Sequence, residues 1–280
     1  YLTTVFEYSD FEVSLGQQAI SSAIVANNLA LAHQHAEVIN KKDKNDPLSN
    51  FVLGYRALSQ GLHETATQYL TRETDEVTIS IMKGLLAGWN FVALGDIDKA
   101  RGEFLFLEGG VYFQNLGQLQ IAKAEGLIGD KDRALEAFKL VKDSGQLRTE
   151  YYLSKARFLI SIDRNKDALL ELEYYLKENN LRGGSEIERY IKLLKSGKTK
   201  NIEKTAIQEA ARALTEPSYW FFVANRSSDA GEILLRLALD LDPNHDKASI
   251  WLGELLENTK RPSEALGLYL SVSDKSSYDI

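Results

Sequence analysis

The sequence contains no cysteine, and it has only four prolines and 19 glycines in 280 residues. Without cysteine the chain can form no disulfide, no zinc–thiolate site and no iron–sulfur cluster, and it has no thiol nucleophile. Sandwiches and barrels of β-strands need many turn residues, so the shortage of glycine and proline favours a mostly helical chain. No apolar run of about 18 residues occurs that would predict a membrane-spanning helix.

Charge and hydrophobicity are close to those of ordinary folded domains. The 33 basic and 40 acidic residues give a formal net charge of -7, which disfavours bulk binding to nucleic acid. Apolar residues make up 44% of the chain and charged residues 26%, values typical of globular domains rather than of disordered tails or membrane proteins. The chain begins at Tyr1 without an initiator methionine, so we expect a processed product or a part of a longer protein.

Small residues recur along the chain with a period of 34 residues. Five alanines keep this spacing: Ala32, Ala66, Ala100, Ala134 and Ala168. Bulky apolar residues follow three of these alanines after four and seven positions, the spacing of a buried helix face: Phe104, Leu107, Phe138, Val141, Leu172 and Tyr175. Twelve positions upstream lie further small residues, which would let two antiparallel helices approach closely: Gly54, Gly88, Ala122 and Ala156. Such a period predicts repeats, each made of two helices.

A glycine followed by an aspartate marks the junction between the two helices of a repeat. Gly95-Asp96 and Gly129-Asp130 lie at equivalent places in consecutive repeats. Glycine suits the left-handed backbone at the end of one helix, and the aspartate side chain can cap the start of the next. The repeat is therefore predicted to be helix, tight turn, helix.

This pattern predicts seven helix pairs. Five pairs come first, at 13–27 with 29–41, 47–60 with 63–72, 77–94 with 97–108, 114–128 with 131–143, and 149–162 with 165–178. Two more follow, at 216–226 with 228–241 and at 245–258 with 262–273. Pro47, Pro217 and Pro262 then fall near helix starts, where a missing N–H is harmless, and Pro243 follows a helix end.

The spacing also indicates an interruption after the fifth pair. Gly231 and Ala265 are again 34 positions apart, whereas Ala168 and Gly231 are 63 apart, which is one repeat plus 29 residues. We therefore expect five repeats at 13–180, a basic helical insertion at 181–212 and two repeats at 213–280, with 1–12 ending a truncated preceding repeat. Stacked pairs share a continuous core and contact mainly their neighbours.

The repeat resembles the tetratricopeptide repeat (TPR). The match is best near the C-terminus, at Gly231, Leu235, Ala238, Pro243, Leu252, Gly253, Leu256, Ala265 and Tyr269. The TPR tryptophan position is not kept, and Ile20 and Tyr219 replace the small residue in the first and sixth units. The resemblance implies an all-α, right-handed TPR superhelical solenoid of about seven helix-turn-helix repeats, with a helical insertion after the fifth.

The order of the repeats resembles a narrower group. Five repeats, an interruption and a final pair that includes Leu-Ala-Leu-Asp-Leu-Asp-Pro-Asn-His-Asp at 237–246 are similar to a poorly characterised group of bacterial TPR proteins, which are usually exported. This resemblance implies a periplasmic location and leaves a cytoplasmic one open.

Residues suited to catalysis or metal binding form no known motif. His33 and His35 lie two positions apart on a predicted helix, roughly 200° around it, so they cannot share a ligand and are interpreted as packed or surface residues. His63-Glu64 lacks the second histidine of a metalloprotease motif, because position 67 is Thr. We therefore predict no enzyme, no cofactor and no metal site.

The inner wall of the predicted solenoid is a candidate binding surface. In TPR arrays the residue after the small position faces the groove, and that register gives five candidates: Tyr55, Trp89, Lys123, Arg157 and Trp220, with Glu254 at the same position in the last repeat. An aromatic end and a cationic middle would suit an extended peptide or helix with an apolar anchor and a carboxylate. The alternative is that the three aromatic residues pack between repeats and the two cations are ordinary surface charges.

A basic segment lies within the predicted insertion. Residues 189–204 contain six cations and only one acidic residue, Glu203. The cations are Arg189, Lys192, Lys195, Lys198, Lys200 and Lys204. The ordinary interpretation is a solvated helix face. The alternative is contact with phosphate, anionic lipid or an acidic partner.

These features together predict a non-catalytic scaffold that binds a peptide or helix of another protein along its concave groove. The alternative is a structural subunit of a larger bacterial envelope assembly, which would use the repeat ends or the basic insertion. Nucleic acid is disfavoured as a partner, no membrane span is predicted, and the sequence leaves the oligomeric state open.

Overall fold

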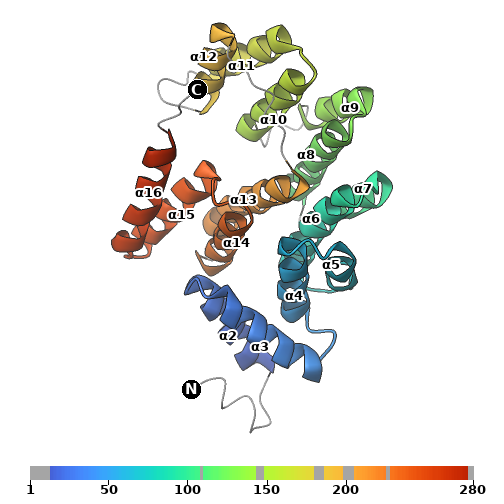
Figure 1. Ribbon diagram of the computed structural model, residues 1–280, viewed down its shortest axis with the longest axis vertical. Helices are drawn as coiled ribbons and strands as arrows, with labels where there is room; N and C mark the ends of the chain where they lie inside the picture. Colours follow the sequence, from blue (N-terminus) through green and yellow to red (C-terminus); the bar gives the residue numbers. More distant parts are fainter. Residues whose placement is uncertain are drawn as a thin grey trace. The chain divides into compact units, whose positions relative to one another are not determined.

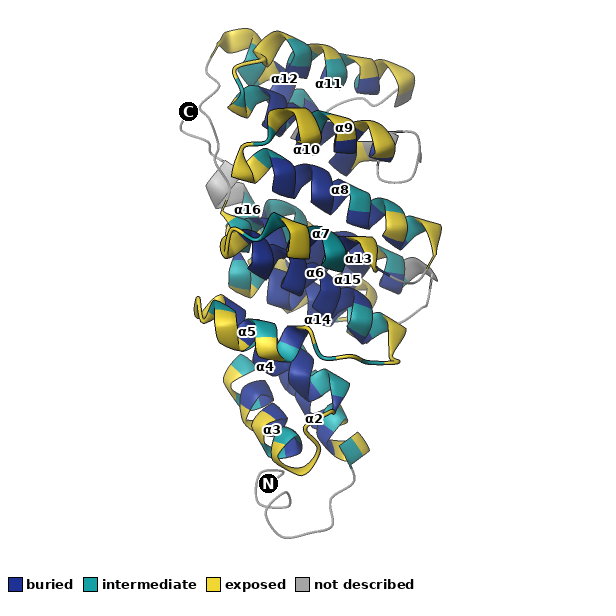
Figure 2. Cartoon of the chain, turned by 90° about the vertical axis from the view of Figure 1, so that its right-hand side faces the viewer, coloured by how far each residue is buried: buried dark blue, intermediate teal, exposed yellow. Residues whose placement is uncertain are grey.

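The computed structural model describes residues 13–107, 110–142, 148–179, 186–197, 205–224 and 228–276. Within these ranges the chain forms fifteen α-helices and no strand (Figure 1). The predicted all-α fold class is confirmed. In Figure 2 the buried sides of the helices face their neighbours, which is the pattern of amphipathic helices that pack in pairs.

Helix pairs joined by short turns make up most of the described chain. The first ten helices are α2 (Val13–Val25), α3 (Leu29–Lys42), α4 (Pro47–Ser59), α5 (His63–Leu70), α6 (Val77–Ala93), α7 (Ile97–Leu105), α8 (Val111–Ile128), α9 (Lys131–Lys142), α10 (Arg148–Ser161) and α11 (Asn165–Asn179). The remaining helices are α12 (Glu186–Ser196), α13 (Ala206–Ala224), α14 (Ser228–Leu241), α15 (Asp246–Asn258) and α16 (Pro262–Ser276). The first five predicted pairs are therefore present, within three residues at each end.

The Gly-Asp junctions have the predicted geometry. Gly95 and Gly129 have φ values of 77° and 96°, in the left-handed region that favours glycine. The side chain of Asp96 accepts a hydrogen bond from the backbone N–H of Lys99 at 3.1 Å. Asp130 does the same for the N–H of Arg133 at 3.0 Å. Each aspartate thus satisfies one of the N–H groups that a helix start leaves without an intrahelical partner.

The alanines that define the 34-residue period lie in the core. All five alanines of the period are fully buried. A side chain at Gly54 would overlap Leu70, and one at Gly88 would overlap the ring of Phe104, so these glycines let the two helices of a pair approach closely. The predicted role of the small upstream residues is confirmed at both positions.

The helix predicted at 216–226 begins ten residues earlier in the structure. The structure has α13 from Ala206 to Ala224, so Pro217 lies inside a helix and not near its start. Proline has no N–H, so the carbonyl of Ala213, four residues earlier, receives no helical hydrogen bond from position 217. Two hydroxyl groups of the same stretch donate to other backbone carbonyls. Thr215 Oγ1 donates to the carbonyl of Ala211 at 3.0 Å, and Ser218 Oγ donates to the carbonyl of Thr215 at 2.6 Å.

The described chain divides into two compact units. Unit 1 contains α2–α7 and α13–α16, and unit 2 contains α8–α12. In unit 2, α8 pairs with α9, α10 pairs with α11, and α12 packs on α11. The expected boundary between residues 212 and 213 falls inside α13, and the one between 180 and 181 lies outside the described residues, as does the expected partial repeat at 1–12.

Unit 1 joins two stretches of chain that are far apart in sequence. Helix α13 packs on α6, and α14 packs on α2. The expectation that each pair contacts mainly its sequence neighbours is wrong for these helices. The physical reason is visible in α6, which buries nearly all residues from Ile79 to Val92 and therefore needs cover on more than the side that α7 provides.

Candidate interaction surfaces

The predicted groove residues of unit 1 are largely covered by the chain itself. Tyr55 on α4 is 1% exposed, and its hydroxyl donates to Asp240 Oδ2 at 2.6 Å and lies 3.0 Å from the carbonyl oxygen of Leu237. Trp89 on α6 is fully buried against Phe104, with ring centroids 5.7 Å apart. Neither side chain offers exposed surface to a partner in this conformation.

Trp220 is the half-buried member of the predicted set in unit 1. It lies on α13, and its ring meets the edge of Phe221 at 5.2 Å between centroids. Its neighbour Tyr219 is exposed and lies 5.6 Å from the ring of Trp251 on α15. The aromatic surface of this part of unit 1 therefore includes residues that the sequence register did not select.

The two predicted cations of unit 2 are mostly buried, and each lies next to polar side chains of its own helix. Lys123 on α8 is 9% exposed and lies 3.4 Å from Gln120 Oε1. Arg157 on α10 donates to Glu150 Oε1 at 2.8 Å, and Ser154 donates to the same carboxylate at 2.9 Å. Neither residue is an ordinary surface charge, because both side chains are mostly withdrawn from water.

The predicted basic patch is described only in part. Arg189, Lys192 and Lys195 lie on α12, whereas Lys198 and Lys200 fall outside the described residues. Lys195 forms an ion pair with Glu173 of α11 at 2.7 Å, and Lys192 is exposed. On the same helix Ile187, Tyr190 and Ile191 are buried, so α12 is amphipathic and turns an apolar side to unit 2.

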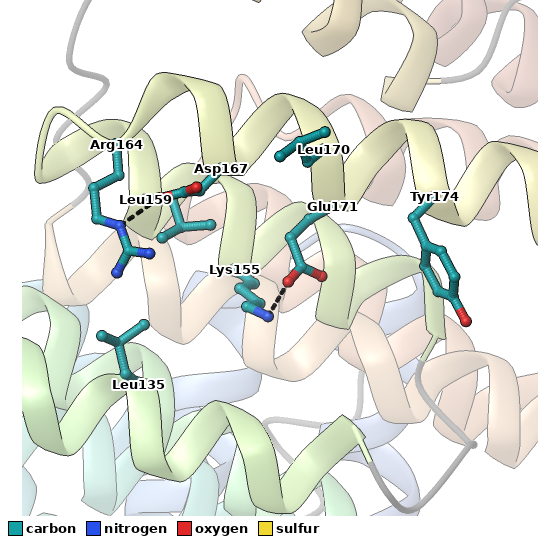
Figure 3. A pocket seen from close by; sticks show the side chains of 8 residues that line it. All are labelled: Leu135, Lys155, Leu159, Arg164, Asp167, Leu170, Glu171 and Tyr174. Carbon is teal, nitrogen blue, oxygen red and sulfur yellow. Dashed lines mark hydrogen bonds and ion pairs between the residues drawn. The ribbon is translucent and has the colours of Figure 1, made fainter.

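A pocket of about 310 Å³ opens in unit 2 between α9, α10 and α11 (Figure 3). Eight residues line it: Leu135, Lys155, Leu159, Arg164, Asp167, Leu170, Glu171 and Tyr174. The side chains of Lys155 and Glu171 point toward each other and form an ion pair, and Arg164 Nε pairs with Asp167 at 2.6 Å. Leu170 and Tyr174 are 63% and 50% exposed at the rim. The sequence does not single out these residues, because exposed leucines on the outer side of a helix look like any other surface position.

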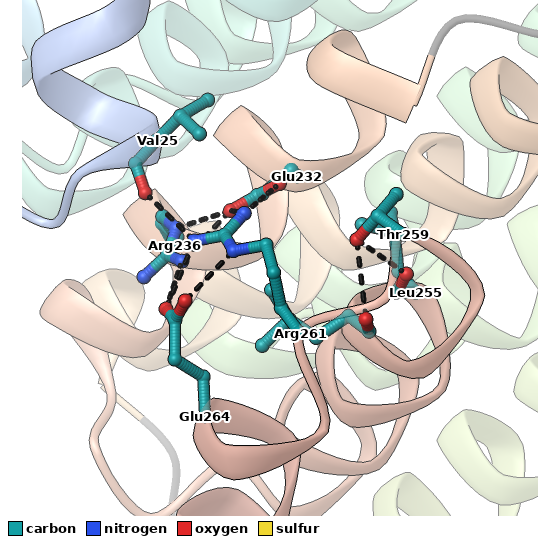
Figure 4. A network of polar contacts seen from close by, with 8 residues as sticks. Val25, Glu232, Arg236, Leu255, Thr259, Arg261 and Glu264 are labelled. Atoms are coloured by element: carbon teal, nitrogen blue, oxygen red, sulfur yellow. Dashed lines mark hydrogen bonds and ion pairs between the residues drawn. The ribbon is translucent and has the colours of Figure 1, made fainter.

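A charged network ties the C-terminal helices of unit 1 together (Figure 4). Glu232 on α14 is 3% exposed and accepts hydrogen bonds from Arg236 Nε and from Arg261 Nη1, both at 2.8 Å. Arg261 also donates to Glu264 at 2.7 Å. The hydrogen bond from Arg261 is the main cause that lowers the pKa of the Glu264 carboxyl below its ordinary value. The i, i+4 spacing of Glu232 and Arg236 was the visible signal in the sequence.

Two titratable groups in unit 1, Lys83 and Glu103, interact with each other. Burial lowers the pKa of Lys83 and raises the pKa of Glu103, and the two charges act on each other. The ammonium of Lys83 donates to the backbone carbonyl of Arg72. His33 and His35 are both buried, as the packed interpretation expected. Across the ranges that the structure describes, no group of three His, Asp or Glu side chains is arranged to hold a metal ion.

Comparison with known proteins finds similar solved structures at low sequence identity. No family model matches the sequence, and no curated protein matches it. A chain in the crystal structure of the APC/C hetero-tetramer Cut9–Hcn1 is similar at 12% identity and a TM-score of 0.42, covering 99% of this chain and 49% of that one. A chain in the structure of Naa15/Naa10 bound to HypK-THB is similar at 9% identity and a TM-score of 0.41, with 91% and 52% covered.

The TPR domain of P58(IPK) is similar at 14% identity and a TM-score of 0.30, covering 95% of this chain and 94% of that one. This chain spans about half the length of the first two structures. Among the helices described here, none combines the length and apolar character needed to cross a membrane.

Proposed function

We propose that the chain is a non-catalytic scaffold built of TPR-like helix pairs that binds a segment of another protein. The 34-residue period and the helix pairs that carry it support this proposal. Arrays of helix pairs present long surfaces whose exposed side chains decide the ligand, while buried positions keep the architecture. A bacterial origin and a periplasmic location stay predictions of the sequence resemblance.

The observation that carries the proposal is the pocket of unit 2. Its apolar residues come from three helices, and Leu170 and Tyr174 stay exposed at the rim. Exposed apolar side chains gathered around a concavity are typical of protein-binding sites, whereas single exposed leucines are not. The ion pair Arg164–Asp167 is exposed and offers charge of both signs, whereas the Lys155–Glu171 pair is less exposed. A segment with one bulky apolar side chain and flanking charged groups fits this pocket.

The predicted inner-face set remains a second surface for the same function. Because Tyr55 and Trp89 are buried, a partner could reach them only after α13 and α14 moved away from α4 and α6. Trp220 is half-buried, whereas Lys123 and Arg157 are mostly buried, and all three stay predicted contacts.

The experiment is site-specific crosslinking at the pocket. A photoreactive phenylalanine derivative replaces Tyr174, the intact chain is irradiated in native extract, and crosslinked partners are identified by mass spectrometry. We expect a discrete product that disappears when Leu170→Glu is added. The matched control is Leu266→Glu, an exposed leucine on α16 that should leave the product unchanged. Equal loss with both variants, or no product at all, would contradict the pocket as the binding site.

A second candidate function is the structural subunit, and the last helix pair favours it. Leu266 and Leu270 lie one turn apart on α16 and are 57% and 54% exposed. Such a pair at the end of a helix array suits stacking onto another subunit. Sedimentation velocity distinguishes the candidates: concentration-dependent assembly lost with Leu266→Glu and kept with Leu170→Glu supports the subunit.

The basic segment would act in the second candidate function, as a contact of the structural subunit with its neighbours. If Arg189, Lys192, Lys195, Lys198 and Lys200 contact an acidic subunit, the assembly should weaken as salt rises, because exposed charges are screened. Assembly that is the same at low and high salt would exclude the basic segment.

A further inference from the structure

A polar pocket of about 490 Å³ opens in unit 1, and it shares no residue with the pocket of unit 2. Its walls come from α3, from the C-terminal end of α4 and from Asp240 on α14. Two consecutive helices and one helix that is distant in sequence thus converge on one concavity. Concave sites with a few converging polar groups are where proteins usually bind small groups.

The charges on its wall are predominantly negative. Glu37 and Asp240 contribute two carboxylates, and Arg56 contributes the single guanidinium among the lining residues. Arg56 Nη1 lies 3.3 Å from Glu37 Oε1, but both side chains are exposed, so this ion pair is weak and can rearrange. The hydroxyl of Tyr55 holds one oxygen of Asp240 at 2.6 Å, which fixes the carboxylate and leaves its second oxygen as an acceptor.

His33 gives an independent indication of a ligand. It lines the pocket, is 9% exposed, and its Nε2 has no hydrogen-bond partner within the described part of the chain. Buried polar nitrogens are satisfied in the great majority of proteins. Burial, and then Arg56, lowers the pKa of His33, while Asp240 and Glu37 act in the opposite direction. The neutral imidazole therefore adds no positive charge to the wall.

These observations select one class of ligand. With two carboxylates and one guanidinium the wall disfavours phosphate and other anions. Among the described residues, no group of three His, Asp or Glu side chains is arranged to hold a metal ion. An ammonium group has three donors and a single charge, which fits separated carboxylates, and Leu29 at the rim can contact an aliphatic chain.

We propose that this pocket binds a primary ammonium group at the end of an aliphatic chain. A lysine side chain of a protein segment and a free aliphatic diamine share this chemistry. The carboxylates of Glu37 and Asp240 receive the ammonium, and the methylene groups lie against Leu29.

The test uses three small probes on the intact chain. Nα-acetyl-lysine methylamide and cadaverine carry the ammonium, and Nα-acetyl-norleucine methylamide has the same apolar chain without it. Binding is followed by chemical-shift changes of the backbone amides of α3 and the end of α4. We expect saturable shifts with at least one ammonium probe and none with the norleucine probe. Saturation with the lysine probe indicates a protein segment as the source, and saturation with cadaverine alone indicates a small amine.

Matched variants assign the effect to the pocket. Glu37→Gln and Asp240→Asn should each weaken binding by about tenfold, since each removes a charged acceptor. Glu73→Gln makes the same change of charge at an exposed position of unit 1 that does not line the pocket, and it should change nothing. Asp240→Asn also alters the contact with Tyr55. Should this variant fail to fold, the result with Glu37→Gln alone tests the proposal. Equal binding of the norleucine probe, or equal weakening by Glu73→Gln, would overturn the proposal.

Discussion

Gly88 on α6 faces the ring of Phe104 on α7, and a methyl group at position 88 would overlap that ring. We expect Gly88→Ala to lower the free energy of unfolding by about 1–2 kcal/mol, because overpacking a filled core outweighs the gain of roughly 1 kcal/mol in helix propensity. Urea unfolding followed by circular dichroism measures the change.

Gly102 on α7 is the control for this substitution. An added side-chain carbon at position 102 would meet no neighbouring atom within 4 Å. Gly102→Ala should therefore raise the free energy of unfolding by up to roughly 1 kcal/mol through helix propensity alone. If both variants shifted stability in the same direction, close packing at Gly88 would not be the cause.

His33 and His35 should make unit 1 sensitive to mild acid. Burial lowers the pKa of both side chains. As the pH falls below about 6.5, these histidines take up protons in the unfolded chain before they do so in the folded one, so the free energy of unfolding falls. We expect this fall between pH 6.5 and 5.5 in urea titrations. The double variant His33→Gln, His35→Gln should show a shallower fall, and an unchanged slope would contradict the assignment.

The residues predicted correctly from the sequence are those whose environment is local. Gly95 and Asp96 could be assigned because the turn and the cap involve residues at most three positions away. Tyr55 could not, because its hydrogen-bond partners on α14 lie more than 180 residues along the chain. Position in a repeat suggests which way Tyr55 points, but not which helix covers it.

At the scale of elements, one hydroxyl on α4, that of Tyr55, hydrogen-bonds two groups of α14. Tyr55→Phe removes the donor to Asp240 and leaves the ring in place, so we expect a loss of about 1–2 kcal/mol in the free energy of unfolding, the cost of a buried hydrogen bond to a charged group. Thermal and urea unfolding of the intact chain measure it.

Tyr69→Phe on α5 is the matched control, because it removes a hydroxyl from a half-buried tyrosine whose hydroxyl has no hydrogen-bond partner among the residues that the structure describes. Adding Asp240→Asn to Tyr55→Phe should cost less than the sum of the two single losses, since the residues act as a pair. Full additivity would mean that Tyr55 and Asp240 stabilise the fold independently.

Helix positions followed from the sequence, whereas the arrangement of α13 did not. Pro217 was interpreted as a helix start, because proline is favoured there and costs a hydrogen bond further inside. The signal for a second packing partner was present in α6, whose residues Ile79 to Val92 are nearly all apolar or small. A helix that is apolar all round must be covered on several sides, but the periodicity alone does not say by which helices.

At the scale of the whole molecule, unit 1 is formed by two stretches of chain that need each other. We predict that residues 1–109 alone will be largely unfolded or aggregated, because α2 and α6 would expose the surfaces that α14 and α13 cover. A chain in which a short Gly–Ser linker joins residue 109 to residue 206 should keep its helicity and unfold in one cooperative transition. Circular dichroism and calorimetry distinguish these outcomes, and equal stability of the two chains would contradict the shared core.

The candidate sites also show which features the sequence predicts and which depend on the folded structure. The pocket of unit 1 needs α3, α4 and Asp240 of α14, and the sequence contains no pattern that brings residue 240 next to residues 33–37. The pocket of unit 2 is built from consecutive helices, but its exposed Leu170 and Tyr174 differ from other surface residues only by what surrounds them. Neither pocket could therefore be predicted from the sequence alone.

The return of α13 and α14 onto α6 and α2 also sets an order of events during synthesis. The ribosome releases the N-terminal helices first, and their covering helices follow only after the whole of unit 2 has been made. At ordinary rates of translation this delay is on the order of ten seconds, much longer than helix pairs need to form. During that interval the apolar surface of α6 is open to chaperones and to other nascent chains, so correct folding of this protein requires that α6 stay shielded until α13 has been made.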